Sequence, residues 1–179
     1  KPAGRGAINT GRRSPTLGKE HYGALSVAPP FAQGKLAVSS AAAGALGAVP
    51  LSPEFSTNAS GGIVLRPIKN LNITADVYQI NIRDRIINGG SYSGMDAVNA
   101  IGQMGSSIPA GIAPGAVTAR YYSNGASTRT QGVDIVASYL TVLHEAGRID
   151  WHLGISLNRT RLTHLADDQN GNPLLTAQG

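Results

Sequence analysis

Residues 148–165 read RIDWHLGISLNRTRLTHL and form the most regularly alternating segment of the chain. Apolar and polar side chains alternate along it. One face carries Ile149, Trp151, Leu153, Ile155 and Leu157, and the other carries Asp150, His152, Gly154, Ser156 and Asn158. A period of two residues is typical of a β-strand with one apolar and one polar face. We therefore expect a long strand over residues 148–165.

A second alternating segment covers residues 120–142 and is joined to the first by the short turn 143–147. The apolar faces of the two segments coincide when the turn is centred on Glu145. That register pairs Tyr139 with Trp151 and Ala137 with Leu153, because a slip by one residue would turn every side chain to the other face. Residues 120–165 are therefore predicted to form an antiparallel hairpin.

Residues 57–86 form a similar pair of segments, 57–66 and 71–86, around a Pro- and Asn-containing turn suited to a tight connection. Centring this turn on Ile68 pairs Leu65 with Leu71. In the second segment the odd positions are apolar as far as Val77, and beyond it the even positions are apolar. Either a β-bulge or a strand that leaves one environment for another would produce this inversion.

The connections differ sharply in length. Residues 1–56 are expected to form a short strand near Arg5 to Arg12 plus a long loop, residues 87–119 a second long loop, and residues 166–179 a third. Short turns at one end of the strands and long loops at the other are the usual plan of bacterial outer-membrane barrels. Tyr139 and Trp151, near the short turn, fit an aromatic girdle at the membrane interface. They could equally form one cross-strand aromatic pair in a soluble sheet.

Composition excludes several classes of protein. The chain has 179 residues, 23 of them glycine and 5% aromatic, which makes a dense globular core hard to fill. It has no cysteine, so thiol catalysis, thiolate metal sites and disulfides are excluded. The net charge is +5, but the basic residues are not accompanied by the aromatic side chains on which bases stack, so a nucleic-acid-binding surface is not predicted. No export signal and no apolar run of about 20 residues is visible.

The sequence predicts no catalytic, cofactor or metal site, and therefore no enzyme. His152 and His164 are twelve residues apart along one strand, too far to share a metal ion. Asp150 and His152 share a strand face, but no nucleophile completes a triad at a suitable spacing. Residues 167–172 resemble a calcium loop only superficially, since an EF-hand frame would put Ala166 first.

Several runs of sequence resemble segments of TonB-dependent outer-membrane receptors. They are INTGRRSPTL (8–17), GALGAVPLSPE (44–54), PEFSTN (53–58), GGIVLRPIKNLNITADVYQINIRDRI (61–86) and YYSNGASTRTQGVDIVASYL (121–140). They occur in the order found in that family and cover most of the chain. In the first run, Arg12 and Ser14 stand where the family pattern has Phe and Ala.

The resemblance implies an all-β, antiparallel, up-and-down partial barrel in the outer membrane of a Gram-negative bacterium. It also implies import of a scarce nutrient, such as a metal chelate, cobalamin or a carbohydrate, with energy from the TonB complex. Family barrels have about 22 strands and a plug in the lumen. No plug, TonB box or closing strand is recognised here, so we expect a middle-to-late part of a receptor that does not transport alone.

Contacts with lipid, with the plug and with the TonB complex follow from the same resemblance. Ligand contacts, although unassigned, would come from loop residues Tyr92, Tyr121, Tyr122 and Asn124 or from lumen-facing Arg129 and Asp134. The alternative is a soluble secreted β-sandwich for adhesion or carbohydrate binding, which would bury the apolar strand faces against a second sheet.

Overall fold

The computed structural model describes residues 2–143, 147–167 and 173–174. Strands dominate it, and the helices are short. In chain order the elements are β1 (Ala3–Arg13), α1 (Leu17–His21), β2 (Ala24–Ala28), β3 (Phe31–Lys35), α2 (Ala41–Ala45), β4 (Glu54–Leu65), β5 (Leu71–Ser93), α3 (Met95–Gln103), the 3-10 helix η1 (Pro114–Ala116), β6 (Val117–Val142) and β7 (Arg148–Leu165).

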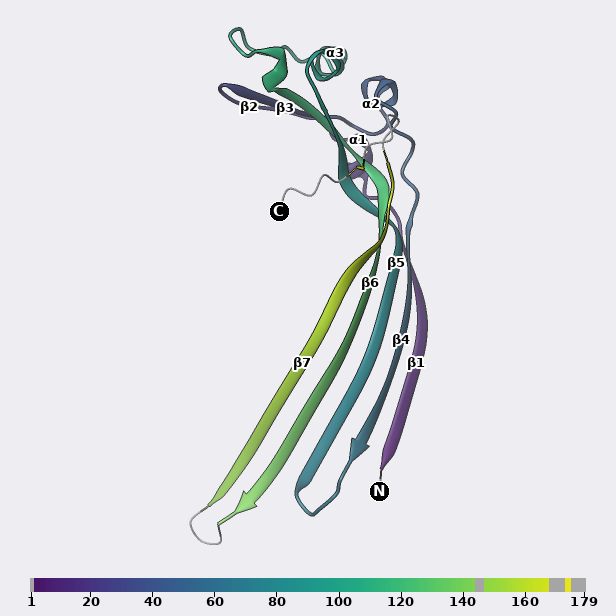
Figure 1. Cartoon of the computed structure of the whole chain (residues 1–179), viewed down its shortest axis with the longest axis vertical. Coiled ribbons are helices and arrows are strands. Elements are labelled where there is room, and N and C mark those ends of the chain that lie inside the picture. The colour runs from purple at the N-terminus through teal and green to yellow at the C-terminus, as the bar shows by residue number, and fades with distance from the viewer. Residues whose placement is uncertain (1, 144–146, 168–172, 175–179) are drawn as a thin grey trace. The chain divides into compact units, whose positions relative to one another are not determined.

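The strands form one sheet in the order β1-β4-β5-β6-β3-β2, with β7 also paired to β6. Long strands β7, β6, β5, β4 and β1 lie side by side in that order (Figure 1). This arrangement confirms the all-β class. One pairing departs from an antiparallel meander, because β3 runs parallel to β6 from Ala32 opposite Val117 to Lys35 opposite Arg120. In the described residues no helix has the length and apolarity to cross a membrane.

The chain divides into two compact units, which we describe separately. Unit 1 comprises Lys1–Gly11, Ser56–Ile82 and Thr128–Arg161. Unit 2 comprises Arg12–Phe55, Arg83–Ser127 and Leu162–Gly179. Over the described part of the chain, every buried apolar side chain belongs to unit 2. Unit 1 is therefore a sheet of long strand segments without a buried core of its own.

Unit 2 contains regular structure where the sequence predicted mainly loops. The hairpin β2–β3 pairs Ala24 with Lys35 and Ala28 with Phe31, within the expected loop of residues 1–56. Helix α3 lies within the expected loop 87–119, and its residue Ile101 is fully buried. A Cβ atom at Gly34 would lie 2.5 Å from the Ile101 side chain, so glycine at this position lets the helix approach β3 closely.

The contacts of unit 1 give the strand register. Between β6 and β7, Thr130 Oγ1 lies 2.8 Å from Thr160 Oγ1, and the Leu143 N–H donates to the Gly147 carbonyl oxygen. Both contacts agree with the predicted turn centred on Glu145, which itself lies outside the described residues.

Between β4 and β5 the pairing is shifted by two residues from the prediction. Asp76 lies against Gly62, where the predicted register put Thr74. The reason lies in the turn, in which the Leu71 N–H donates to the Ile68 carbonyl oxygen and Asn70 adopts a positive φ of 66°. A shift by two residues leaves each side chain on the same face of the sheet.

Candidate functional site

The sheet of unit 1 has two chemically different faces. One face carries the odd-numbered residues of β4 to β7 and the even-numbered residues of β1, and we call it the apolar face. The opposite face is called the polar face. Three side-chain contacts between neighbouring strands show that the odd-numbered residues of β5, β6 and β7 share one face. They are Gln131 Nε2 to Gln79 Oε1 at 2.8 Å, Arg129 Nε to Asn81 Oδ1 at 2.8 Å, and Trp151 Nε1 to Thr141 Oγ1 at 3.2 Å.

On the polar face, Arg5 of β1 forms an ion pair with Asp76 of β5. Its Nη2 lies 2.7 Å from Asp76 Oδ2, and its Nε donates to Oδ1 at 3.1 Å. The two strands are not neighbours, since β4 lies between them. Gly62 of β4 makes the contact possible, because a Cβ atom there would collide with the Asp76 carboxylate. The bidentate geometry fixes the orientation of both side chains.

Three further polar-face contacts follow the same alternation. Asn58 Nδ2 donates to Asn9 Oδ1 at 2.7 Å between β4 and β1, and Thr130 and Thr160 form the hydroxyl contact described above. The Tyr78 ring covers Gly132 of β6, where a Cβ atom would collide with the ring. Polar side chains on this face therefore pair across strands, although among the described residues Asn58 Oδ1 is buried without a hydrogen-bond partner.

The apolar–polar alternation inverts after Val77, but the side chains of β5 do not exchange faces at this point. Tyr78 lies on the polar face against Gly132, and Gln79 and Asn81 remain on the same face as Val77. Pairing with β6 is regular across this point, which excludes a bulge there. What changes along β5 is the character of the residues on the apolar face, from apolar before Val77 to polar after it. Of the two alternatives, the bulge is therefore excluded at this point, and a strand that passes into another environment stays a prediction.

The apolar face is exposed across unit 1. Large side chains on it keep between about 40% and 70% of their surface accessible. They include Ile63 (48%), Val77 (54%), Ile135 (38%), Tyr139 (41%), Trp151 (58%), Leu153 (63%), Ile155 (47%) and Leu157 (68%). So large a patch of exposed apolar side chains marks a surface that meets another protein or a membrane.

Polar side chains border this apolar patch at one end, and aromatic side chains border it at the other. The aromatic row, Tyr139 and Trp151, lies near the turn between β6 and β7. The arginine row, Arg129, Arg159 and Arg161, lies at the opposite end of the same face. The expectation that Arg129 and Asp134 face the same side is wrong, because residues of odd separation on a strand point to opposite faces. Asp134 belongs to the polar face, and Arg129 to the apolar face.

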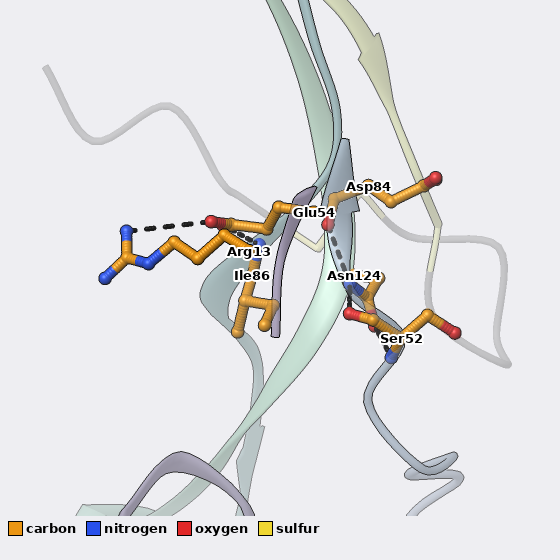
Figure 2. Close-up of polar contacts among 6 residues, drawn as sticks. All are labelled: Arg13, Ser52, Glu54, Asp84, Ile86 and Asn124. Atoms are coloured by element: carbon orange, nitrogen blue, oxygen red, sulfur yellow. Dashed lines mark hydrogen bonds and ion pairs between the residues drawn. The ribbon is translucent and has the colours of Figure 1, made fainter. Parts of the chain in front are cut away.

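In unit 2, a set of hydrogen bonds ties the chain before β4 to β5 and β6 (Figure 2). The Asn124 amide nitrogen donates to the carbonyl oxygens of Ser52 and Asp84, at 2.8 and 2.7 Å, while its oxygen accepts from the Ser52 N–H at 2.7 Å. Nearby, Glu54 accepts from the Ile86 N–H at 2.8 Å and lies 3.7 Å from Arg13. These contacts satisfy backbone groups and hold the strands together.

Comparison with known proteins decides the family. The model of the family described as TonB dependent receptor-like, beta-barrel, matches residues 3–178. The chain belongs to the TonB-dependent receptor β-barrel family. No curated protein and no solved structure matches it. Members of this family are outer-membrane receptors rather than enzymes, and the resemblance found in the sequence is confirmed.

The residues expected in loops and considered for ligand contact in this TonB-dependent receptor chain lie in strands, Tyr92 in β5 and Tyr121, Tyr122 and Asn124 in β6, and most have structural partners. Asn124 bonds to the backbone, as described. Tyr121 is 3% exposed, stacks on Tyr92 with ring centroids 5.8 Å apart, and donates to the Leu46 carbonyl oxygen. Tyr122 accepts a hydrogen bond from Lys35 Nζ at 2.7 Å and is partly exposed. Tyr121 and Asn124 therefore stabilise the fold of unit 2.

The histidine and carboxylate residues of the receptor chain do not gather into a metal site in the described residues. His21 Nδ1 lies 2.9 Å from the Ser39 hydroxyl. Asp150 and His152 line a hollow of about 140 Å³, together with Ser138, which the sequence spacing did not connect with them. Asp150 is 3.7 Å from Arg148, so its carboxylate has a partner. Of the calcium-like segment 167–172, residues 168–172 lie outside the described part.

Proposed function

We propose that unit 1 is a section of the wall of an outer-membrane receptor barrel. Its apolar face contacts lipid, its polar face lines the aqueous lumen, and the protein imports a scarce nutrient from outside the cell. Family membership supports the receptor class. The specific observation that carries the orientation is the spacing between the aromatic row and the arginine row.

This spacing matches the thickness of the apolar part of a membrane. Trp151 and Arg161 are ten residues apart on β7, or about 33 Å at about 3.3 Å per residue. At the strand tilt of about 40° usual in such barrels, that length spans about 25 Å along the membrane normal. The apolar band of an outer-membrane barrel is about 25 Å tall. Aromatic side chains would then lie at the periplasmic interface and arginines at the outer one.

The polar face has the properties expected of a lumen wall. Arg5 and Asp76 form an ion pair, and Asn9 and Asn58 a hydrogen bond, without a covering layer of apolar residues. Such groups are costly in lipid unless water or a partner satisfies them. In a hydrated lumen, water forms hydrogen bonds with the polar atoms that are not paired across strands. This fits a barrel better than the sandwich alternative, in which two apolar faces would be packed together.

The sheet edges indicate how unit 1 would be completed. In the part of the chain that the structure describes, β1 pairs with β4 alone and β7 with β6 alone. An open sheet edge is not tolerated in lipid. We therefore propose that further barrel strands pair with β1 and β7, and that nutrient import also requires a plug and the TonB complex. The nutrient is a metal chelate, cobalamin or a carbohydrate.

Fractionation of cells of the source organism tests this proposal. An antibody against residues 121–140 is used to probe outer-membrane and soluble fractions. We expect a band several times larger than 18 kDa in the outer membrane, released only by detergent. A band near 18 kDa in the soluble fraction would contradict the receptor proposal and favour a secreted soluble module.

A further inference from the structure

A groove lies on the apolar face of unit 1, near the end of the exposed apolar patch that the arginine row borders. Its volume is about 780 Å³, within the range of about 300 to 1,000 Å³ typical of small-molecule sites. The groove forms where Gly6, Gly61 and Ala59 carry one side-chain carbon or none, between the larger side chains of Ile8 and Val77. A methylene chain would fill such a depression better than the flat aromatic faces of a protein partner.

One end of the groove is polar. Gln79 and Gln131 line it there and are hydrogen-bonded to each other at 2.8 Å. Arg129 lies on the same face, two residues before Gln131 on β6. Its Nε donates to Asn81, which uses one of the five N–H donors of the guanidinium group.

The charge at this end of the face is of one sign. Arg159 and Arg161 are both exposed and lie on the neighbouring strand β7, beside Gln131 and Arg129 respectively in the register given by Thr130 and Thr160. The carboxylates of unit 1 in the described residues, Asp76, Asp134 and Asp150, all belong to the polar face. The arginine row therefore has no acidic residue of unit 1 beside it on its own face, and guanidinium groups bind phosphate with paired hydrogen bonds.

We propose that this groove and the arginine row form a binding site for an anionic phospholipid-like molecule of the outer leaflet. One acyl chain lies in the groove over Gly6 and Gly61, and the phosphate lies against Arg129, Arg159 and Arg161. The inference rests on the proposed function, because it requires the apolar face to meet lipid. It adds a specific lipid site to a face that would otherwise contact the membrane without selectivity.

Lipid binding by the detergent-purified protein, with bound lipid first removed, tests the site. The probes are phosphatidylglycerol and phosphatidylcholine with identical acyl chains, and retained lipid is counted by native mass spectrometry. We expect the unaltered protein to retain phosphatidylglycerol in preference. Replacing Arg159→Gln together with Arg161→Gln should weaken that binding about tenfold or more, since both bonds are to a charged phosphate.

Two further variants separate charge from shape. Arg66→Gln with Arg148→Gln removes two exposed arginines from the polar face and should leave lipid retention unchanged. Gly61→Leu fills the groove without changing charge and should weaken retention of phosphatidylglycerol. A Cβ atom at Gly61 meets only the Arg5 carbonyl oxygen, at 3.8 Å, so this position accepts a side chain.

The outcomes distinguish this inference from the proposed function. Equal retention of both lipids by protein recovered from the outer membrane would overturn the lipid site and leave the receptor assignment intact. Equal loss in the polar-face control would also overturn it, because binding would then follow total charge. Absence of the protein from the outer membrane would overturn both proposals together.

Discussion

Replacing Ile155 with arginine puts a positive charge at the centre of the apolar face of β7. Ile155 is four residues from Trp151 and four from Arg159, or about 13 Å along the strand from each. Its side chain is 47% exposed, so the arginine fits without a steric clash and the change tests the surroundings alone. At the midplane of a bilayer, arginine on the lipid face costs about 2 to 4 kcal/mol. That cost lowers the folding equilibrium constant about 30-fold to 1,000-fold.

Ser156→Arg is the matched control, since Ser156 is the next residue on the same strand and lies on the polar face. We expect it to cost about 1 kcal/mol or less, because a hydrated lumen solvates the charge. The free energy of unfolding is measured by urea titration of the purified protein in phospholipid vesicles, and Trp151 provides the fluorescence signal. Equal costs for the two variants, or a larger cost for Ser156→Arg, would refute the assignment of the faces.

Three further predictions concern close contacts. Gly132→Val should cost about 1 to 3 kcal/mol, because its Cβ would collide with the Tyr78 ring; thermal unfolding measures the loss, and failure of Tyr78→Ala to restore stability would contradict this cause. Gly62→Ala should displace the Asp76 carboxylate and lower stability, and the loss should shrink in an Asp76→Ala background, whereas full additivity in this double-mutant cycle would be inconsistent with the contact. Asn124→Asp should destabilise unit 2 by about 1 to 3 kcal/mol, because a carboxylate cannot donate to the two carbonyl oxygens that the amide now binds; an unchanged melting temperature would oppose it.

The features that sequence could predict are those governed by alternation. The β6–β7 register followed from the need to bring Trp151 and Tyr139 to one face. In the first hairpin, alternation decided the face but not the pairing, because a shift by two residues preserves it. The turn decided the pairing, through the positive φ of Asn70.

Contacts between distant segments could not be predicted. Helix α3 becomes part of the core of unit 2 because glycine at position 34 lets Ile101 pack closely against β3. The sequence of the helix alone does not reveal this contact. The prediction that Arg129 shares a face with Asp134 is wrong, since their separation of five residues already places the two side chains on opposite sides of a strand. Asn124 is an ordinary polar residue in the sequence, and its role depends on Ser52, 72 positions earlier.

The most direct test of the account is the accessibility of alternate positions on β7 to water and to lipid. The chain has no cysteine, so single cysteines can be introduced at Leu153, Ile155, Gly154 and Ser156. With the protein in native outer membranes, we expect a water-soluble maleimide to label positions 154 and 156 and a lipid-soluble reagent to label positions 153 and 155. Uniform labelling of all four positions by the water-soluble reagent would contradict the claim that the apolar face of unit 1 meets lipid.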